Sequence, residues 1–172
     1  MATYHHNISG ELTQELIAPG SNVRISSITL TNVQKVSKCK VDLYIEKKLT
    51  GKFYLLKQME LPIGASLVYD DIFFNNAADE FGLYIKLTDG ATFTLTGSID
   101  VTGTNVNVPG TNTLFLSELS IGDEVVISGE TRTIATITSD TAATVTAAFG
   151  SDLANDTTPD CNPTALVDVI IK

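Results

Sequence analysis

The sequence predicts an all-β fold: an antiparallel β-sandwich, immunoglobulin-like or jelly-roll-like, that carries an inserted small five-stranded β-barrel. Short segments of β-branched and aromatic residues recur along the chain, separated by Gly, Asn, Asp and Pro. This spacing of strands and turns is typical of sandwiches and barrels. A change of composition near Thr92, which reverses close to the C-terminus, indicates two structural units.

The first part of the chain shows the alternation expected of half-buried strands. Val23 and Ile25 begin an apolar face that Ile28 and Leu30 continue in shifted phase, which predicts a bulge near Ser26–Ser27. In Cys39–Ile45, apolar and polar residues alternate without interruption. Further strands are predicted at Phe53–Leu61, Ala65–Tyr69 and Leu83–Leu87, with turns at Leu49–Gly51 and Pro62–Gly64.

One segment of this first part breaks the strand pattern. Ile72–Phe81 (IFFNNAADEF) lacks alternation, so we expect a loop or a short helical turn there. Its adjacent phenylalanines, Phe73 and Phe74, need cover from another surface. They either contact a partner subunit or cap the core of the sandwich.

From about Thr92 to Thr158 the chain is rich in Thr, Ser, Gly and Ala. Ser128–Glu130 and Ser139–Thr141 read as tight turns, and Leu114–Leu119 reads as a helical turn or an irregular strand. Five short strands in a segment of this length indicate a small barrel. These strands are Thr94–Val101, Asn105–Val108, Glu124–Ile127, Thr131–Thr138 and Ala143–Ala148.

The tail decides the predicted domain boundaries. After the loop-rich segment Gly150–Pro163, the residues Ala165–Ile171 form an apolar strand pattern that matches the first part of the chain. An apolar strand of this kind should be paired, because an open apolar edge promotes aggregation. We therefore predict a sandwich of residues 1–91 and 163–172 with residues 92–162 inserted. Two consecutive domains, with the tail strand in the second, remain the alternative.

Bulk properties exclude several classes of protein. The chain has 172 residues, of which 18% are charged, and a net charge of −9. This acidity argues against a nucleic-acid partner, because phosphate binding needs a basic surface. No apolar run reaches the roughly 18 residues of a membrane helix, and the N-terminus lacks the layout of a secretory signal. We therefore expect synthesis in a cytoplasm and neither nucleic acid nor membrane as a partner.

Residues for catalysis or metal binding are sparse, and we expect no enzyme activity and no cofactor. His5 and His6 are adjacent, so on a strand they point to opposite faces and chelate one metal poorly. Cys39 has the phase of a buried residue, whereas Cys161 is expected in a loop; a disulfide between them stays open but is disfavoured in a cytoplasm. The acidic side chains are expected at solvated loop ends: Asp70, Asp71, Asp79, Glu80, Asp152, Asp156 and Asp160.

Part of the Thr-rich segment resembles a small β module of tailed-bacteriophage virion proteins. The module has the pattern GTGT.F…L..GD.I.I.GE…V.SI.SDT.LTV…F. Here Ile121–Phe149 reads IGDEVVISGETRTIATITSDTAATVTAAF, and the match is good there but poorer before it. Gly110–Thr113 replaces the usual Gly/Thr run, and Ala142–Ala143 stand where a larger apolar residue is common.

The first part of the chain is similar to β-sandwich virion structural proteins of phages of aquatic bacteria. The similarity is carried by Ile28–Asn32, Val41–Ile45 and Tyr54–Leu67. These resemblances imply a structural component of a tailed-phage virion, made in the host bacterial cytoplasm. Its partners would be other virion structural proteins and further copies of itself. The neck, tail or baseplate is favoured over the alternative, a capsid decoration protein.

The contact residues expected for such a subunit are exposed apolar side chains and the edge of the C-terminal strand. They are Tyr4, Ile72, Phe73, Phe74, Val169 and Ile171. Two rival functions stay open. A carbohydrate-binding module of a host-recognition fibre would need Tyr54, Tyr69 and Tyr84 exposed together in one groove. A hydrolase would use Asp70, Asp71, Asp79 or Glu80 in a concave pocket with a raised carboxyl pKa.

Overall fold

The computed structural model describes residues 3–47, 50–76 and 80–172. The chain forms two compact units, each described below by itself. Unit 1 contains Met1–Gln34, Lys38–Asp89 and Ala165–Lys172, and unit 2 contains Lys35–Ser37 and Gly90–Thr164. The insertion predicted from the sequence was residues 92–162. The main segment of unit 2 is Gly90–Thr164, so each predicted boundary differs by two residues.

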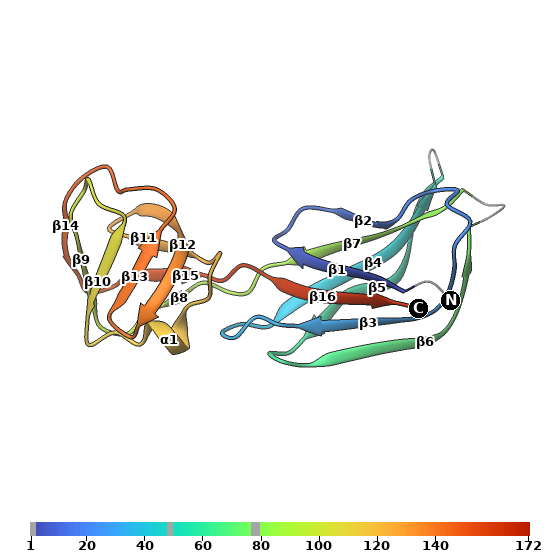
Figure 1. Cartoon of the computed structure of the whole chain (residues 1–172), viewed down its shortest axis with the longest axis horizontal. Coiled ribbons are helices and arrows are strands. Elements are labelled where there is room, and N and C mark those ends of the chain that lie inside the picture. The colour runs from blue at the N-terminus through green and yellow to red at the C-terminus, as the bar shows by residue number, and fades with distance from the viewer. Residues whose placement is uncertain (1–2, 48–49, 77–79) are drawn as a thin grey trace. The chain divides into compact units, whose positions relative to one another are not determined.

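Unit 1 is a sandwich of two four-stranded antiparallel sheets, so the predicted all-β sandwich is confirmed (Figure 1). One sheet has the order β1-β16-β3-β6 and the other β2-β7-β4-β5. The strands of the first sheet are β1 (Tyr4–Ser9), β16 (Leu166–Ile171), β3 (Arg24–Asn32) and β6 (Ser66–Asn75). Those of the second are β2 (Gln14–Ile17), β7 (Gly82–Thr88), β4 (Cys39–Lys47) and β5 (Gly51–Leu61).

The core of unit 1 lies between these sheets and follows from strand alternation. In β4, Cys39, Val41 and Leu43 point inward and are buried, whereas Lys40 is exposed. Ile28 and Leu30 of β3 and Leu83 of β7 are fully buried and belong to the same cluster. The expected role of Cys39 as a small buried hydrophobe is confirmed, and its thiol is free.

The predicted bulge of unit 1 and one of its two predicted turns are present. The backbone N–H groups of Ser26 and Ser27 both donate to the carbonyl oxygen of Lys172, at 2.7 and 3.1 Å, as in a β-bulge. In the Pro62–Gly64 turn, the N–H of Ala65 donates to the Pro62 carbonyl oxygen at 3.1 Å. In the other predicted turn, Leu49–Gly51, Leu49 lies outside the described residues.

The prediction of a loop or a short helical turn at Ile72–Phe81 is wrong for the first residues of this segment. Strand β6 continues to Asn75, and Ile72 and Phe74 are buried in the core. The alternation was hidden because β6 is irregular here: Phe74 pairs with Ile25 and Asp70 with Ser27. Residues 77–79 of this segment lie outside the described residues.

Unit 2 is a second antiparallel β structure with its own core. Its strands follow the order β14-β9-β10-β13-β12-β11-β15-β8, so its strand count is eight and not the predicted five. Closure of this sheet into a barrel stays a prediction. The strands are β8 (Phe93–Thr94), β9 (Ser98–Val101), β10 (Asn107–Thr111), β11 (Glu124–Ile127), β12 (Glu130–Ser139), β13 (Ala142–Val145), β14 (Leu153–Asp156) and β15 (Asp160–Asn162).

A short helix and two tight hairpins complete unit 2. Helix α1 (Phe115–Glu118) occupies the segment expected to be a helical turn or an irregular strand, and Phe115 is fully buried. Ser128 and Gly129 both have positive φ, 48° and 86°, as a two-residue type I′ hairpin requires. In the part of the chain that the structure describes, no helix is long and apolar enough to span a membrane.

The extra strands of unit 2 arise in the segment expected to be loop-rich. Within Gly150–Pro163, β14 pairs with β9 and β15 pairs with β11 and β8. Cys161 is therefore not in a loop: it lies in β15, is fully buried and has a free thiol. Both strands are very short and rich in Asn and Asp, so neither periodicity nor propensity marked them.

The C-terminal strand belongs to the sandwich. β16 pairs with β1 on one side and with β3 on the other, as Figure 1 shows. The alternative of two consecutive domains, with this strand in the second, is therefore wrong. Next to the strand, the backbone N–H of Ala165 donates to a carboxylate oxygen of Asp89 at 2.7 Å. This bond joins the segment Lys38–Asp89 of unit 1 to the segment Ala165–Lys172, where the chain leaves unit 1 and returns to it.

Candidate protein–protein interface

The structure separates the six residues expected to make subunit contacts. Phe73 is 97% exposed, and Tyr4 is half-buried against the core. The other four side chains, Ile72, Phe74, Val169 and Ile171, are buried in the core of unit 1. The expected edge pairing of the C-terminal strand is also wrong, because β16 has a strand on each side.

The adjacent phenylalanines have different environments because successive strand residues point to opposite faces. Phe74 points inward and caps the core, as one of the two sequence-based alternatives proposed. Phe73 points outward and is almost entirely in contact with solvent. A phenylalanine this exposed has a hydrophobic surface available to a partner.

Phe73 is one of several exposed apolar side chains on two consecutive strands of unit 1 and the turn between them. β5 and β6 are edge strands of opposite sheets, joined by residues 62–65, and we call these three elements together the β5–β6 flank. Unit 1 has eight large hydrophobic side chains that are described as exposed, and six belong to this flank. The six are Phe53, Tyr54, Met59, Ile63, Val68 and Phe73.

Five of these six side chains were not identified from the sequence as contact residues. One sequence pattern could have predicted exposed apolar side chains here. Phe53–Leu56 is an uninterrupted apolar run, and a strand with such a run has apolar side chains on both of its faces. Irregular pairing of β5 with β4 adds to the exposure, since register shifts occur between Val41 and Leu43 and again before Tyr44. Bulges of this kind are common at sheet edges.

A pocket of about 360 Å³ lies beside Phe73. Opposite the single residue Ser26, β6 has the three residues Asp71–Phe73 and thus two extra residues, because Ile25 pairs with Phe74 and Ser27 with Asp70. The two strands therefore separate locally. The pocket at this place is lined by Arg24, Ile25, Ser26, Ile72, Phe73, Phe74 and Asn75.

A row of tyrosines crosses the outer face of the other sheet. Tyr44 pairs in register with Tyr54 on β5 and with Tyr84 on β7. The ring centroids are 5.4 Å apart for Tyr44–Tyr54 and 5.8 Å for Tyr44–Tyr84. Tyr44 is only 1% exposed although it points away from the core. The row is thus a packed cluster on the sheet surface.

Lysines cover this tyrosine row. The Lys52 ammonium lies 4.4 Å from the Tyr44 ring centroid and donates a hydrogen bond to its hydroxyl oxygen at 3.1 Å. The Lys57 ammonium lies 4.3 Å from the Tyr54 ring centroid. The hydrogen bond to Tyr44 raises the pKa of Lys52. These cation–π contacts occupy ring faces that a sugar would need.

The condition set for the carbohydrate-binding alternative is not met. Tyr54 and Tyr84 share one sheet face, but Tyr69 lies on β6 of the opposite sheet and packs partly against the core. The Tyr84 hydroxyl donates to a Glu15 carboxylate oxygen at 3.3 Å, and burial is the main cause of its raised pKa. Tyr54, Tyr69 and Tyr84 therefore do not lie together in one groove.

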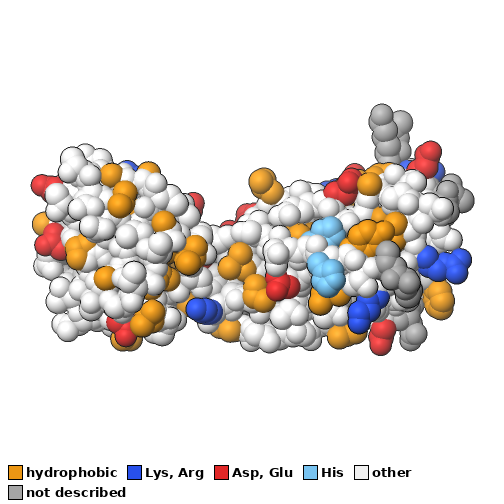
Figure 2. All heavy atoms as spheres, in the orientation of Figure 1, with side chains coloured by type: hydrophobic (Ala, Val, Ile, Leu, Met, Phe, Trp, Pro, Cys, Tyr) orange, Lys and Arg blue, Asp and Glu red, His pale blue; other side chains and the backbone are white. Residues whose placement is uncertain are grey.

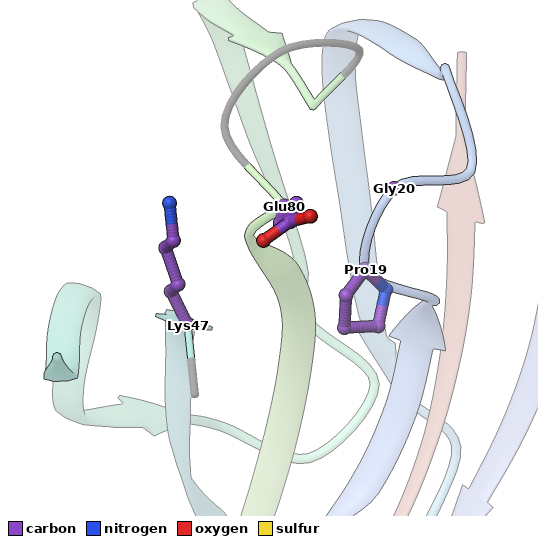
Figure 3. Close-up of a pocket in the computed structure, with 4 residues that line it drawn as sticks. All are labelled: Pro19, Gly20, Lys47 and Glu80. Carbon is purple, nitrogen blue, oxygen red and sulfur yellow. The ribbon is translucent and has the colours of Figure 1, made fainter. Parts of the chain in front are cut away.

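A second pocket of unit 1, about 340 Å³, contains one of the acids considered for a hydrolase. Figure 3 shows its lining residues: Pro19 and Gly20 after β2, Lys47 at the end of β4, and Glu80 before β7. Of the other candidate acids, Asp70 is exposed on β6, whereas Asp79 and the Asp71 side chain lie outside the described part. The described residues of this pocket thus include one carboxylate opposite one ammonium group.

The acids of unit 2 hold loops in place. Asp152 accepts a hydrogen bond from the N–H of Gly103 at 2.8 Å, and Asp160 accepts one from the Thr94 hydroxyl at 2.7 Å. Asp156 accepts hydrogen bonds from the N–H groups of Ser128 and Thr158. Each of these carboxylates thus satisfies a backbone or hydroxyl donor of a neighbouring loop or strand.

The two histidines reach the surface of unit 1 (Figure 2). His5 is exposed and His6 is half-buried, as the alternation of β1 requires. Burial, followed by the neighbouring His5, lowers the pKa of His6, while a hydrogen bond with the Leu16 backbone opposes this change. Among the described residues, no three His, Cys, Asp or Glu side chains are arranged to hold a metal ion.

Comparison with known proteins does not assign the chain to a family. No protein-family model and no curated protein sequence matches it. One solved structure, that of the PBSX exported protein XepA, is 10% identical in sequence. The alignment covers 96% of this chain and 81% of that protein, with a TM-score of 0.25. At that score the likeness carries no argument about this chain.

Proposed function

We propose that the chain is a structural subunit of a tailed-phage virion and acts through protein–protein contacts rather than catalysis. One observation carries the contact part of this proposal: six of the eight exposed large hydrophobic side chains described in unit 1 lie on the β5–β6 flank. The phage part is supported by the resemblance of Ile121–Phe149 to a virion β module.

The flank is suited to binding another protein for two physical reasons. Edge strands carry backbone N–H and C=O groups that a neighbouring chain can satisfy. Apolar side chains beside such an edge gain free energy when a partner removes them from water. Here β5 and β6 are long edge strands, whereas β1 and β2 on the opposite side are shorter.

Within a virion, the neck, tail or baseplate is the place we favour, and capsid decoration is the alternative. Proteins at these positions repeat around a symmetry axis, so contacts to like and unlike subunits are both expected. Other virion proteins and further copies of this chain are the proposed partners.

The test is whether the chain is part of assembled particles. Particles from cells that produce the chain naturally would be purified by density gradient and probed with an antibody against the purified protein. We expect the chain to sediment with the particles in a fixed ratio to their major protein. A chain found only among free proteins at the top of the gradient would contradict the proposal.

Light scattering of the purified chain at several concentrations distinguishes the positions within the particle. A fixed closed assembly, such as a hexamer or dodecamer, supports a ring in the neck or tail. A protein that is a monomer at every concentration but sediments with particles supports capsid decoration. Adding the chain to particles that lack it would test this second outcome directly.

A further inference from the structure

We infer that the surface around Phe73 is a contact with a second copy of this chain, in which Phe73 of each copy enters the pocket beside Phe73 of the other. This inference rests on the proposed function and deepens it, because it names one partner and one contact. It comes from an exposed aromatic side chain and a pocket that occur together on β6.

The pocket is large enough for an aromatic ring and partly apolar. Its volume is about 360 Å³, and Ile25, Ile72 and Phe74 contribute to its lining. An apolar cavity of roughly 150 Å³ can already hold benzene. Phe73 forms part of the wall yet is 97% exposed, so its own ring does not fill the space.

Self-association follows from the way these features are combined. A two-fold interface uses the same patch on both copies, so the patch must contain both the inserting group and its receptor. Phe73 is the inserting group, and the adjoining pocket is the receptor. A partner of a different kind would need only one of these two features.

The charges near Phe73 agree with a two-fold contact. Arg24 lines the pocket and is exposed, and Asp70 is exposed on β6, three residues before Phe73. Exposed charges of both signs near Phe73 allow the surface to pair reciprocally with its copy.

The first test measures self-association of the full chain by analytical ultracentrifugation over a wide range of concentrations. We expect a reversible dimer for the wild type and a dissociation constant at least about 100-fold higher for Phe73→Ser, since central aromatic contacts dominate such interfaces. Leu12→Ser is the matched control because Leu12 is 80% exposed but lies between β1 and β2. It should leave the dissociation constant unchanged.

Charge reversal provides the second test. Arg24→Asp and Asp70→Lys should each raise the dissociation constant about tenfold, and the double variant should recover most of the affinity. An equimolar mixture of the two single variants should associate more tightly than either variant alone. Both substitutions are at exposed positions, so circular dichroism should show unchanged folding for all the variants.

Each outcome bears on the inference. A wild-type dimer whose affinity is unaffected by Phe73→Ser overturns the contact, while particle association would leave the proposed function intact. A wild-type monomer at every concentration also overturns the second copy as the partner. If Phe73→Ser then abolishes association with particles, the pocket receives another virion protein. A Phe73-dependent dimer absent from particles supports the contact and contradicts the virion role.

Discussion

Units 1 and 2 are both antiparallel β structures, yet they differ in where they expose apolar side chains. In unit 1 these side chains concentrate on two edge strands and the turn between them. In unit 2 the exposed large hydrophobic side chains that the structure describes lie outside its strands, in α1 and in loops. They are Val106, Leu114, Leu116 and Ile121.

The outer faces of the strands differ in the same way. Unit 1 carries a tyrosine row covered by lysines, whereas unit 2 carries threonines such as Thr136 and Thr144, whose hydroxyl groups lie 2.7 Å apart. A threonine face is β-forming and hydrated, so it needs no partner. The two units therefore differ in the exposure of apolar edge strands more than in strand content.

The largest expected effect tests whether the units are also separate in stability. Phe115→Ala removes a fully buried ring from the core of unit 2 and should lower its free energy of unfolding by about 3–5 kcal/mol. All five tyrosines lie in unit 1, and the chain has no tryptophan. Urea unfolding followed by tyrosine fluorescence should therefore be nearly unchanged, while far-UV circular dichroism shows an earlier transition.

The matched variant for unit 1 is Leu83→Ala, at a position that is also fully buried. It should shift the tyrosine transition by about 2–5 kcal/mol and leave the unfolding of unit 2 in place. If Phe115→Ala shifted the tyrosine signal as strongly as the dichroism signal, the two units would unfold as one cooperative block. The two units would then not be independent in stability.

A second prediction compares the buried thiols. Burial, followed by the charge of Asp89, raises the pKa of Cys39 from 9.0 to about 11, and burial raises the pKa of Cys161 further. The folded state thus keeps the Cys39 proton when the unfolded state has lost it. Stability contributed by this difference is present below about pH 9 and is lost as the pH rises towards 11.

The measurement is the free energy of unfolding in urea between about pH 8.5 and 11. The wild type should lose about 2–3 kcal/mol more than Cys39→Ala over this range, because each pKa unit corresponds to about 1.4 kcal/mol. The variant removes the thiol, so ionisation of tyrosines and lysines cancels between the two proteins. Parallel pH curves would show that Cys39 titrates alike in the folded and unfolded states.

Sequence patterns identified most of the sandwich because its strands alternate regularly. Cys39–Ile45 is the clearest case, and the bulge at Ser26–Ser27 was visible as a phase shift between Ile25 and Ile28. In contrast, β14 and β15 are short and polar and form only because unit 2 offers partners for them. Local patterns contain no information about such long-range pairing.

The exposed apolar side chains were harder to predict than the fold. Phe73 and Phe74 are identical in type and adjacent, so only their phase relative to the core decides which one is exposed. The extra residues of β6 opposite Ser26 shift that phase, and the sequence does not mark them. Exposure at Phe53 and Met59 depends on β5 being an edge strand, which is a property of the assembled sheet.

The smallest expected effect concerns the lysines that cover the tyrosine row of unit 1. The threonine face of unit 2 is hydrated without such a cover. Lys52→Met keeps the length of the side chain but removes its charge and its hydrogen bond to Tyr44. The unfolding free energy of unit 1 should fall by about 0.5–1 kcal/mol, as expected for an exposed cation–π contact, measured by tyrosine fluorescence in urea. Lys86→Met is the control, since Lys86 is exposed on neighbouring β7. Equal effects of both substitutions would mean that the lysine charge over Tyr44 adds nothing, and that ring packing alone stabilises this face.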